Sequence, residues 1–281
     1  MSKIMLTAFC LCAQLAVAAA PSAPALSISV NESDGGAVYR GWTIVIDAIL
    51  SHPNLRQNDS STFLLSPQSG NWADGLRVQA LNQNGVDQNW TFETAGSPDV
   101  NAVTLDSNSI IQAQWLVSPD DTGKLTPGVY QIVASLKIDA SADPNGWTGT
   151  VTSRPVTIQV ADEPPSPSSD QQTRKQVLLA TFKDFAGDHD GALAVVNAVL
   201  GNDPHNVQLL SLKSGLLAES GDFFNAFTAV SDAVAAVYTQ NPQPPEPPGD
   251  LILQQHDMLT HLLSGVTSVA PTRCPSGPSQ K

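Results

Sequence analysis

The apolar residues of this chain change their spacing once, at a segment rich in proline and serine. Apolar and polar residues alternate in several runs up to residue 160, whereas apolar residues recur every three or four positions after residue 173. Alternation is typical of strands with one buried face, and the longer spacing is typical of helices with one buried stripe. The segment between them, ADEPPSPSSDQQ, is too rich in proline and serine to continue either element. The sequence therefore predicts two folded parts joined by a semi-extended linker.

The patterns also place the boundaries of a multidomain fold in which the β domain comes first. An antiparallel β-sandwich is expected over residues 25–161, the linker over 162–172, and a helical domain over 173–264. Residues 265–281 are rich in proline, serine and glycine, and a disordered tail is expected there. With 281 residues, 41% of them hydrophobic, the chain is long enough for two cores of ordinary size.

Three segments of the first part alternate most clearly, and we expect the apolar face of each to be buried. These faces carry Trp42, Ile44, Ile46, Ala48 and Leu50; Tyr130, Ile132, Ala134, Leu136 and Ile138; and Val156, Ile158 and Val160. Further strand candidates are ALSISV, STFLLS, GLRVQAL, NWTFETA and SIIQAQWLV, with turns expected at Asp34-Gly35, Asn84-Gly85 and Asp121-Thr122-Gly123. Seven or eight strands with short connections predict two antiparallel sheets packed face to face.

A six-residue segment, LTPGVY at residues 125–130, resembles the Leu-x-Pro-Gly-x-Tyr segment that opens a late strand in many immunoglobulin-like sandwiches. In that family the tyrosine hydroxyl hydrogen-bonds to nearby backbone, so the resemblance implies such a bond from Tyr130. The run VTSRPVTIQV is similar to the closing strand of bacterial immunoglobulin-like modules. The chain has no inter-sheet cysteine pair, and the resemblance is therefore to the disulfide-free members.

Residues of the second part repeat at a fixed spacing. Gly187-Asp188 and Gly221-Asp222 lie 34 residues apart, and so do Ala192 and Ala226. A period of 34 in a helical region resembles the tetratricopeptide repeat, which is a pair of antiparallel helices. The resemblance covers about residues 172–241 and implies two helix pairs.

The apolar stripes of this part are consistent with two helix pairs and one more helix. The stripes are Leu178, Phe182 and Phe185; Ala192, Val196 and Val199; Leu209, Leu212 and Leu216; Phe223, Phe227, Val230, Val234 and Val237; and Leu251, Met258 and Leu262. Asp188 and Asp222 are predicted to lie at a helix N-cap or in the turn before it, and Asp203 is predicted to cap a helix that begins at Pro204. Two repeats with one capping helix are fewer than the three usually needed for stability. The end helices must therefore be covered by the sandwich, a second copy or a partner.

The first twenty residues have the three-part form of a secretory signal peptide. Lys3 precedes an apolar run, and small residues follow before Pro21. The run is short for a membrane span, so we expect cleavage and an exported protein, either periplasmic or extracellular. Only Cys274 of the three cysteines would then remain, which leaves pairing between chains as its one route to a disulfide.

Charge and motifs exclude several kinds of site. The chain has 26 acidic and 13 basic residues, a net charge of −13, without the Lys and Arg clusters that nucleic-acid binding requires. Asp184, Asp188 and Asp190 lack the glutamate that closes a calcium loop, and His256 and His261 lack the spacing of a zinc-binding His-Glu-x-x-His helix. We therefore predict no catalytic residues, no metal ligands and no cofactor.

These features favour an exported, non-enzymatic protein–protein interaction or adapter protein whose repeat array binds a polypeptide partner. In tetratricopeptide arrays the first helix of each pair lines the binding groove. The resemblance therefore implies binding residues on these two helices. They are Arg174, Thr181, Asp184, Gln208 and Ser211.

Two other interpretations remain open. In a carbohydrate-binding or adhesion module, exposed rings beside turns would stack on sugars, and Trp72, Trp90 and Trp147 stand in such positions. The chain is an enzyme in the other interpretation, with a site that the sequence does not reveal. The partner's identity and a homo-oligomeric state are open in every case.

Overall fold

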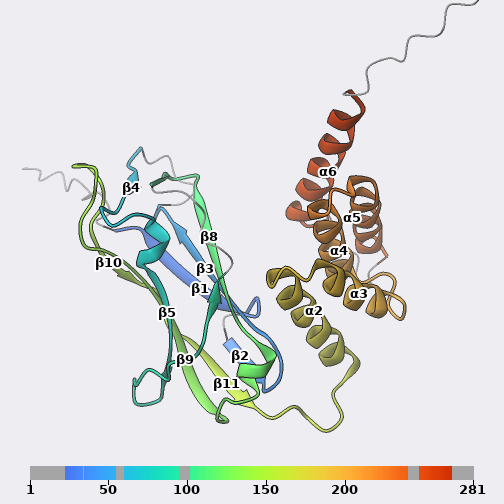
Figure 1. Cartoon of the computed structure of the whole chain (residues 1–281), viewed down its shortest axis with the longest axis horizontal. Coiled ribbons are helices and arrows are strands. Elements are labelled where there is room, and N and C mark those ends of the chain that lie inside the picture. The colour runs from blue at the N-terminus through green and yellow to red at the C-terminus, as the bar shows by residue number, and fades with distance from the viewer. Residues whose placement is uncertain (1–22, 34, 55–59, 95–101, 240–246, 268–281) are drawn as a thin grey trace, which may run out of the picture.

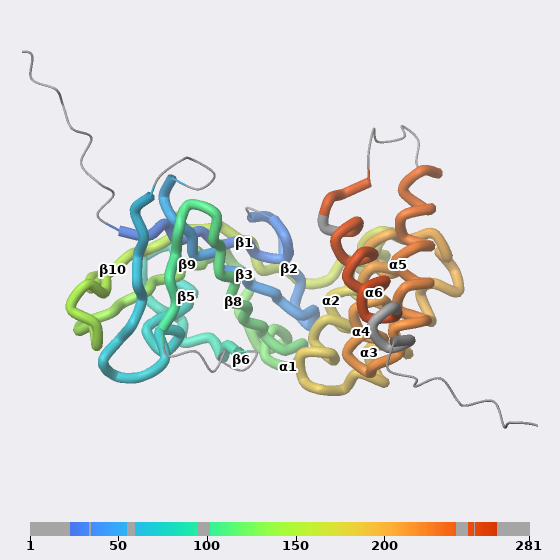
Figure 2. The backbone as a smooth tube through the Cα atoms, turned by 90° about the horizontal axis from the view of Figure 1, so that it is seen from above, coloured from blue at the N-terminus to red at the C-terminus, as the bar shows by residue number. Residues whose placement is uncertain are grey.

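The computed structural model describes residues 23–33, 35–54, 60–94, 102–239 and 247–267. Within them the fold is mixed, with largely antiparallel sheets and six α-helices. The strands lie in residues 25–161, here called the β part, and helices α2 to α6 lie in residues 169–267, here called the helical part. Figures 1 and 2 show the two parts side by side. The expected signal peptide and Cys274 lie outside the described residues.

The described residues contain eleven strands rather than the expected seven or eight, because several are only two to five residues long. The strands are β1 (Ala25–Val30), β2 (Gly35–Tyr39), β3 (Ile44–Ser51), β4 (Phe63–Leu65), β5 (Leu76–Asn82), β6 (Glu93–Thr94), β7 (Val103–Leu105), β8 (Ile110–Val117), β9 (Gly128–Ile138), β10 (Gly149–Thr152) and β11 (Val156–Ala161). The helices are α1 (Pro119–Thr122), α2 (Ser169–Phe185), α3 (His189–Leu200), α4 (Val207–Glu219), α5 (Phe223–Val237) and α6 (Gly249–Thr267), with a 3₁₀ turn at Trp72–Gly75.

One sheet has the order β1-β3-β8-β6. In the other, β9 pairs with β5, β10 and β11, and β2 pairs with β11 in parallel. A separate pair joins β4 to β7. All three predicted apolar faces are buried. Every residue of these faces except Trp42 belongs to one continuous core of the β part. The alternation is therefore confirmed as the signal of the buried faces.

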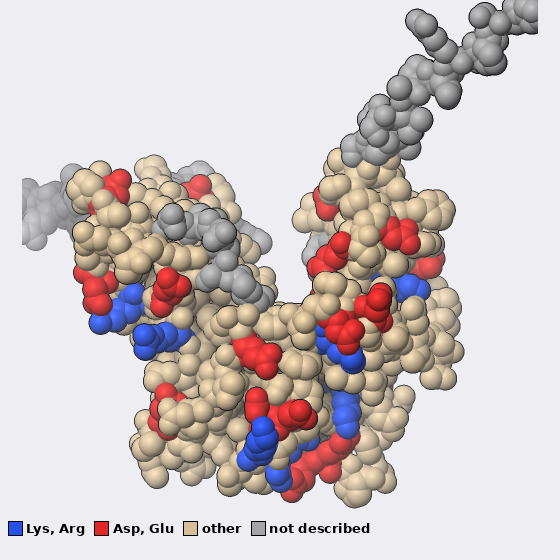
Figure 3. Space-filling model, in the orientation of Figure 1, with Lys and Arg blue, Asp and Glu red and all other residues tan. Residues whose placement is uncertain are grey.

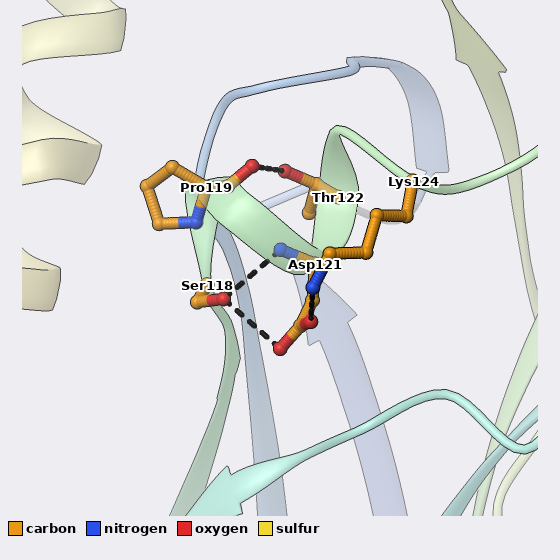
Figure 4. Close-up of polar contacts among 5 residues, drawn as sticks. All are labelled: Ser118, Pro119, Asp121, Thr122 and Lys124. Carbon is orange, nitrogen blue, oxygen red and sulfur yellow. Dashed lines mark hydrogen bonds and ion pairs between the residues drawn. The ribbon is translucent and has the colours of Figure 1, made fainter.

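Two local predictions in the β part have different outcomes. The Tyr130 hydroxyl donates a hydrogen bond to the Thr126 carbonyl at 2.7 Å, as the LTPGVY resemblance implied. The turn expected at Asp121-Thr122-Gly123 is instead largely the end of helix α1. Ser118 Oγ accepts a hydrogen bond from the Asp121 amide at 3.1 Å, and Pro119 occupies the first helical turn (Figure 4). Prediction from the turn residues alone missed this cap.

The helix caps of the helical part follow the 34-residue spacing. Asp188 accepts a hydrogen bond from the Gly191 amide at 3.0 Å, and Asp222 accepts one from the Asn225 amide at 3.2 Å. Each aspartate follows a glycine with positive φ, 78° at Gly187 and 82° at Gly221. Glycine adopts this conformation at helix ends without the steric cost of a Cβ. Both predicted caps are confirmed.

The predicted cap at Asp203 is wrong. Helix α4 begins at Val207, and its N-cap is Asn206, whose Oδ1 accepts a hydrogen bond from the Leu209 amide at 3.1 Å. Asp203 instead accepts a bond from Asn206 Nδ2 at 3.0 Å. Two cap-forming residues lie close together in this loop, and the sequence did not show which of them would bind the helix.

Helix α2 also begins earlier than the predicted linker allows. Ser168 and Gln171 form a capping box, in which each side chain bonds to the other residue's backbone, and this starts the helix at Ser169. The remaining linker is held at its first two residues, since Asp162 pairs with Arg40 at 2.8 Å and Glu163 pairs with Lys175 at 2.7 Å. At the other end of the helical part, α6 continues to Thr267, into the expected tail.

The C-terminal end of the helical part is covered by α6. Leu251 and Met258 of α6 are buried in the core that the helices share, as their stripe predicted, and Leu262 is half-buried. Ser211 Oγ of α4 donates a hydrogen bond to Gln254 Oε1 at 2.8 Å, which joins the two helices. The last helix is therefore part of the array.

Candidate functional site

Apolar side chains join α2 to the β part. Trp42, Val45, Leu116 and Leu178 are buried together in what we call the interdomain cluster. Three partly buried rings complete it, from Tyr39, Phe182 and Phe185. The α2 stripe therefore packs on the β part, which is one of the three covers that the sequence left open.

Short helix α1 supports the centre of this cluster. Thr122 Oγ1 donates a hydrogen bond to the Trp42 carbonyl at 2.7 Å, and Thr122 is itself buried. The Lys175 ammonium lies 5.7 Å from the centre of the Trp42 ring, within range of a cation–π interaction. Trp42 is therefore held from both sides, by the β part and by α2.

Hydrogen bonds at the rim of the cluster also cross between the parts. Arg174 Nη2 donates to the Asn31 carbonyl at 2.9 Å, and Gln208 Nε2 lies 3.2 Å from Glu32 Oε2. Asn31 and Glu32 have positive φ, 49° and 61°, which is costly for a glutamate. Asn31 Oδ1 accepts a bond from the Val45 amide at 2.8 Å and so ties this turn to β3. The strained turn presents its oxygen atoms to α2 and α4.

A cleft of ≈ 1480 Å³ lies between the two parts. Its β wall includes Asp47 of β3 with Gln112 and Gln114 of β8, and its helical wall is formed mainly by α2 and the α3–α4 connection. Figure 3 shows the molecule hollowed between the β part and the helical part. The cleft thus has polar groups on both walls.

Carboxylates predominate among the charged residues of the cleft. Asp47 is the most enclosed, with 8% of its surface exposed, and its Oδ1 accepts hydrogen bonds from Gln112 Nε2 at 3.1 Å and Gln114 Nε2 at 2.9 Å. The other carboxylates are those of Glu32, Glu163, Asp170 and Asp203, and the cations are Arg174 and Lys175.

Both cations of the cleft already have partners. Arg174 is bonded to the Asn31 carbonyl, and Lys175 is paired with Glu163. The Lys175 hydrogen bond lowers the pKa of Glu163. In the part of the chain that the structure describes, no Lys or Arg is paired with Asp47 or Asp170. The cleft therefore presents uncompensated negative charge.

The five predicted binding residues do not share one surface. Arg174, Thr181 and Gln208 line the cleft, whereas Asp184 and Ser211 do not. Ser211 is bonded to α6, and Asp184 belongs to a separate cluster described below. Asp184 and Ser211 therefore lie outside this cleft, and their role in binding a partner stays a prediction.

None of the predicted binding residues lies on the β wall of the cleft. A signal was present in the run IVIDAIL, residues 44–50, whose second face carries Val45, Asp47 and Ile49. Apolar residues on both faces of a strand indicate cover on both faces, and Val45 and Asp47 are buried whereas Ile49 is exposed. Asp47 on such a face is a carboxylate in a partly enclosed site.

The tryptophans of the carbohydrate interpretation are not exposed platforms. Trp72 is 2% exposed and lies in the core of the β part, where the 3₁₀ turn holds it. Trp90 and Trp147 are partly buried against the same core, and Trp90 lies 5.1 Å from the Tyr130 ring, centroid to centroid. The structure therefore offers no exposed ring at these three positions to support the carbohydrate interpretation.

Three ligating side chains meet at one end of the helical part. His189 Nδ1 lies 2.7 Å from Asp184 Oδ1 and 3.5 Å from Glu219 Oε2. The hydrogen bond to Asp184 raises the pKa of His189. Burial and the nearby Asp184 carboxylate raise the pKa of Glu219. The sequence did not indicate this cluster because Glu219 lies far along the chain from the other two.

Comparisons with known proteins place the chain in no family. No family model matches it, and no curated protein matches it. Within the described residues, no helix combines the length and apolar character needed to cross a membrane.

Three solved structures share a limited likeness. A family 123 glycoside hydrolase from Clostridium perfringens is 11% identical with a TM-score of 0.25, over 53% of this chain and 29% of the hydrolase. AvmM, which catalyses macrocyclization in alchivemycin A biosynthesis, is 14% identical with a TM-score of 0.27, over 53% of this chain and 94% of AvmM. AggA, the major subunit of aggregative adherence fimbriae type I from Escherichia coli, is 14% identical with a TM-score of 0.21, over 50% of this chain and 96% of AggA. Scores at this level carry no argument about function.

Proposed function

We propose that this protein is an exported, non-enzymatic adapter that binds an extended polypeptide in the cleft between its two parts. The observation that carries the proposal is the cleft itself, which is ≈ 1480 Å³ in volume and has hydrogen-bonding side chains on both walls. An extended peptide carries a donor and an acceptor at every residue other than proline, so polar groups on both walls suit it. Export rests on the signal-peptide pattern of residues 1–20.

The proposal includes the finer fold. The β part is proposed to be an immunoglobulin-like sandwich, which the hydrogen bond from Tyr130 to the Thr126 carbonyl supports. The helical part is proposed to be a tetratricopeptide-like array of two pairs, α2 with α3 and α4 with α5, closed by α6. Caps at Asp188 and Asp222, 34 residues apart, support this part of the proposal. Such arrays bind polypeptides on the surfaces that their helices form.

The charge of the cleft specifies the partner's chemistry as basic. Asp47 and Asp170 have no cationic partner among the described residues, and both cleft cations are already engaged. Lys or Arg side chains of a bound segment would supply the missing charge. A partly enclosed carboxylate such as Asp47 interacts more strongly than an exposed one, because water screens it less.

Peptide binding to the tag-free mature chain tests this function. A library of extended peptides of varied charge is titrated at low and high salt, with fluorescence anisotropy as the readout. We expect peptides with several Lys or Arg residues to bind, with affinity that falls as salt rises. Asp47→Asn should weaken binding about tenfold, since charge pairs of this kind contribute on the order of 1–2 kcal/mol.

The matched control is Asp232→Asn, which makes the same change of charge on the exposed face of α5, outside the cleft. It should leave the affinity within about twofold of the wild-type value. Equal losses in the two variants would mean that only the net charge of the protein attracts the peptide. Binding that is indifferent to Asp47 would exclude the cleft as the binding site.

A further inference from the structure

Asp184, His189 and Glu219 lie together at one end of the helical part, where α2 and α4 end and α3 begins. Asp184 lies in the last turn of α2, His189 is the first residue of α3, and Glu219 is the last residue of α4. One ligand atom from each lies within 4.8 Å of the other two. The cluster is separate from the cleft, which none of the three residues lines.

We propose that Asp184, His189 and Glu219 bind a zinc ion that links the first helix pair to the second. The donor set is one imidazole nitrogen and two carboxylate oxygens, which zinc accepts together. An imidazole donor disfavours calcium and magnesium, which take oxygen ligands. Three protein ligands leave the fourth position of a tetrahedral zinc ion to water, and the cluster opens to solvent, since the His189 side chain is 48% exposed.

Two of the three distances between ligand atoms suit such an ion after a small adjustment, and the third pair, from Asp184 and Glu219, lies within 4.8 Å. Ligands that lie about 2.0–2.1 Å from a tetrahedral zinc ion are about 3.3 Å from one another. The separation of 3.5 Å between His189 Nδ1 and Glu219 Oε2 already matches that value. The 2.7 Å contact between His189 Nδ1 and Asp184 Oδ1 is a hydrogen bond, which zinc would replace as the two atoms move apart by less than 1 Å.

The helix ends give an independent reason to expect a cation here. Asp184 and Glu219 lie at the carboxyl ends of α2 and α4, where the helix dipole disfavours a negative side chain. A divalent metal would satisfy both carboxylates. The nearby cation Lys183 does not, because its Nζ is paired with Asp188 at 2.6 Å.

Zinc bound here would act as a cross-link between repeats. Asp184 and His189 belong to the first pair and Glu219 to the second, so the ion would hold the pairs together at one end. Because it would bind the folded array and not the separated helices, it should raise the melting temperature.

The test uses the tag-free mature chain after treatment with chelator and dialysis. Zinc chloride titrated at pH 7.5 should give saturable binding of one ion per chain by calorimetry. The melting temperature of the helical signal should rise by about 5 °C or more at zinc concentrations 100-fold above the Kd. His189→Gln and Glu219→Gln should each weaken zinc binding at least tenfold, because each removes one of three ligands.

The control His205→Gln removes an exposed histidine that lies outside the cluster, and it should bind zinc like the wild type. Far-ultraviolet circular dichroism of each variant checks that the helices are retained. The proposal is overturned if zinc fails to bind, or if it binds His189→Gln and Glu219→Gln as tightly as the wild type. Calcium chloride is titrated in parallel, and calcium binding as tight as zinc binding would overturn the assignment of the metal.

Discussion

The two helix pairs of the helical part begin their second helices alike and are covered differently. Asp188 and Asp222 cap α3 and α5 in the same way. The first pair packs its α2 stripe on the β part through Leu178, while the second pair is covered by Leu251 and Met258 of α6. The residues that the two pairs share fix the start of the second helix in each pair. The residues that differ determine which part of the protein covers each pair.

The positions at which the two pairs carry different residues show how each pair is matched to its cover. Phe182 and Phe185 of α2 lie beside the β part, whereas Leu216 and Glu219 occupy the positions 34 residues later. Leu216 is buried in the helical core, and Glu219 belongs to the polar cluster with Asp184. A repeat of two pairs has no interior copy, so each pair carries the residues of its own end.

The largest expected effect comes from breaking the cover of the first pair. Leu178→Ala with Phe182→Ala removes two apolar side chains from the interdomain cluster, of which Leu178 is 7% exposed. The pair should cost about 3–5 kcal/mol of unfolding free energy, since Leu178 is buried and Phe182 partly so. Urea unfolding, followed by circular dichroism, measures the loss. A loss below about 1 kcal/mol would mean that the β part does not stabilise α2.

The cover of the second pair should contribute a somewhat smaller amount. Leu251→Ala with Met258→Ala removes two buried side chains, 4% and 6% exposed, from α6. This helix lies at the end of the chain and can move to reduce the cavity, so we expect about 2–4 kcal/mol. Thermal melting should show a decrease of more than about 5 °C. An unchanged melting temperature would contradict the role of α6 as the cover.

The two matching N-caps should respond alike to substitution by alanine. Asp188→Ala and Asp222→Ala each remove one N-cap, and each should lower the melting temperature of the helical part by a few degrees, about 2–6 °C. Asp188 also pairs with Lys183 at 2.6 Å, so its variant should show the slightly larger decrease. A difference of more than about 5 °C between the two would show that the copies are not equivalent at their caps.

The smallest effect concerns the linker. The ion pair of Glu163 with Lys175 holds the linker against α2, and both side chains are about one third exposed, so Glu163→Gln should cost about 0.2–1 kcal/mol at pH 7. The folded pKa of Glu163 lies below its ordinary value of 4.5, so this stabilisation is present above that value and is lost as pH falls through the folded pKa. The stabilities of the variant and the wild type should therefore converge as the pH falls from 4.5 through the folded pKa of Glu163.

Asp232→Asn serves as the control for this comparison, because it removes a charge from the exposed face of α5. It should show no such convergence. A stability difference between Glu163→Gln and the wild type that does not shrink as the pH falls below 4.5 would contradict the ion-pair explanation.

The features that the sequence predicted are those set by neighbouring residues. The alternation in IVIDAIL and GVYQIVASLKI gave the buried faces of β3 and β9, and Gly-Asp pairs gave the caps of α3 and α5. Each depends on a few successive residues and their fixed geometry. Even locally, competing caps misled the prediction at Asp203, since the neighbouring Asn206 caps the helix.

The features that the sequence did not predict depend on packing between distant segments. Asp47 lies in the cleft only because α2 packs beside β3, and Asp184 meets Glu219 only because α2 and α4 end at the same level. Two of the five predicted binding residues, Asp184 and Ser211, lie outside the cleft for the same reason. No periodicity within one helix reports which other element will cover it.

The central claim is that the helical part depends on the β part for the cover of its first helix. The direct measurement compares residues 165–267 alone with the same residues in the full chain, by thermal melting of the helical signal and by sedimentation. Alone, the fragment should melt at least about 10 °C lower, or associate through its exposed α2 stripe of Leu178, Phe182 and Phe185. A monomeric fragment that melts at the temperature of the full chain would contradict the account.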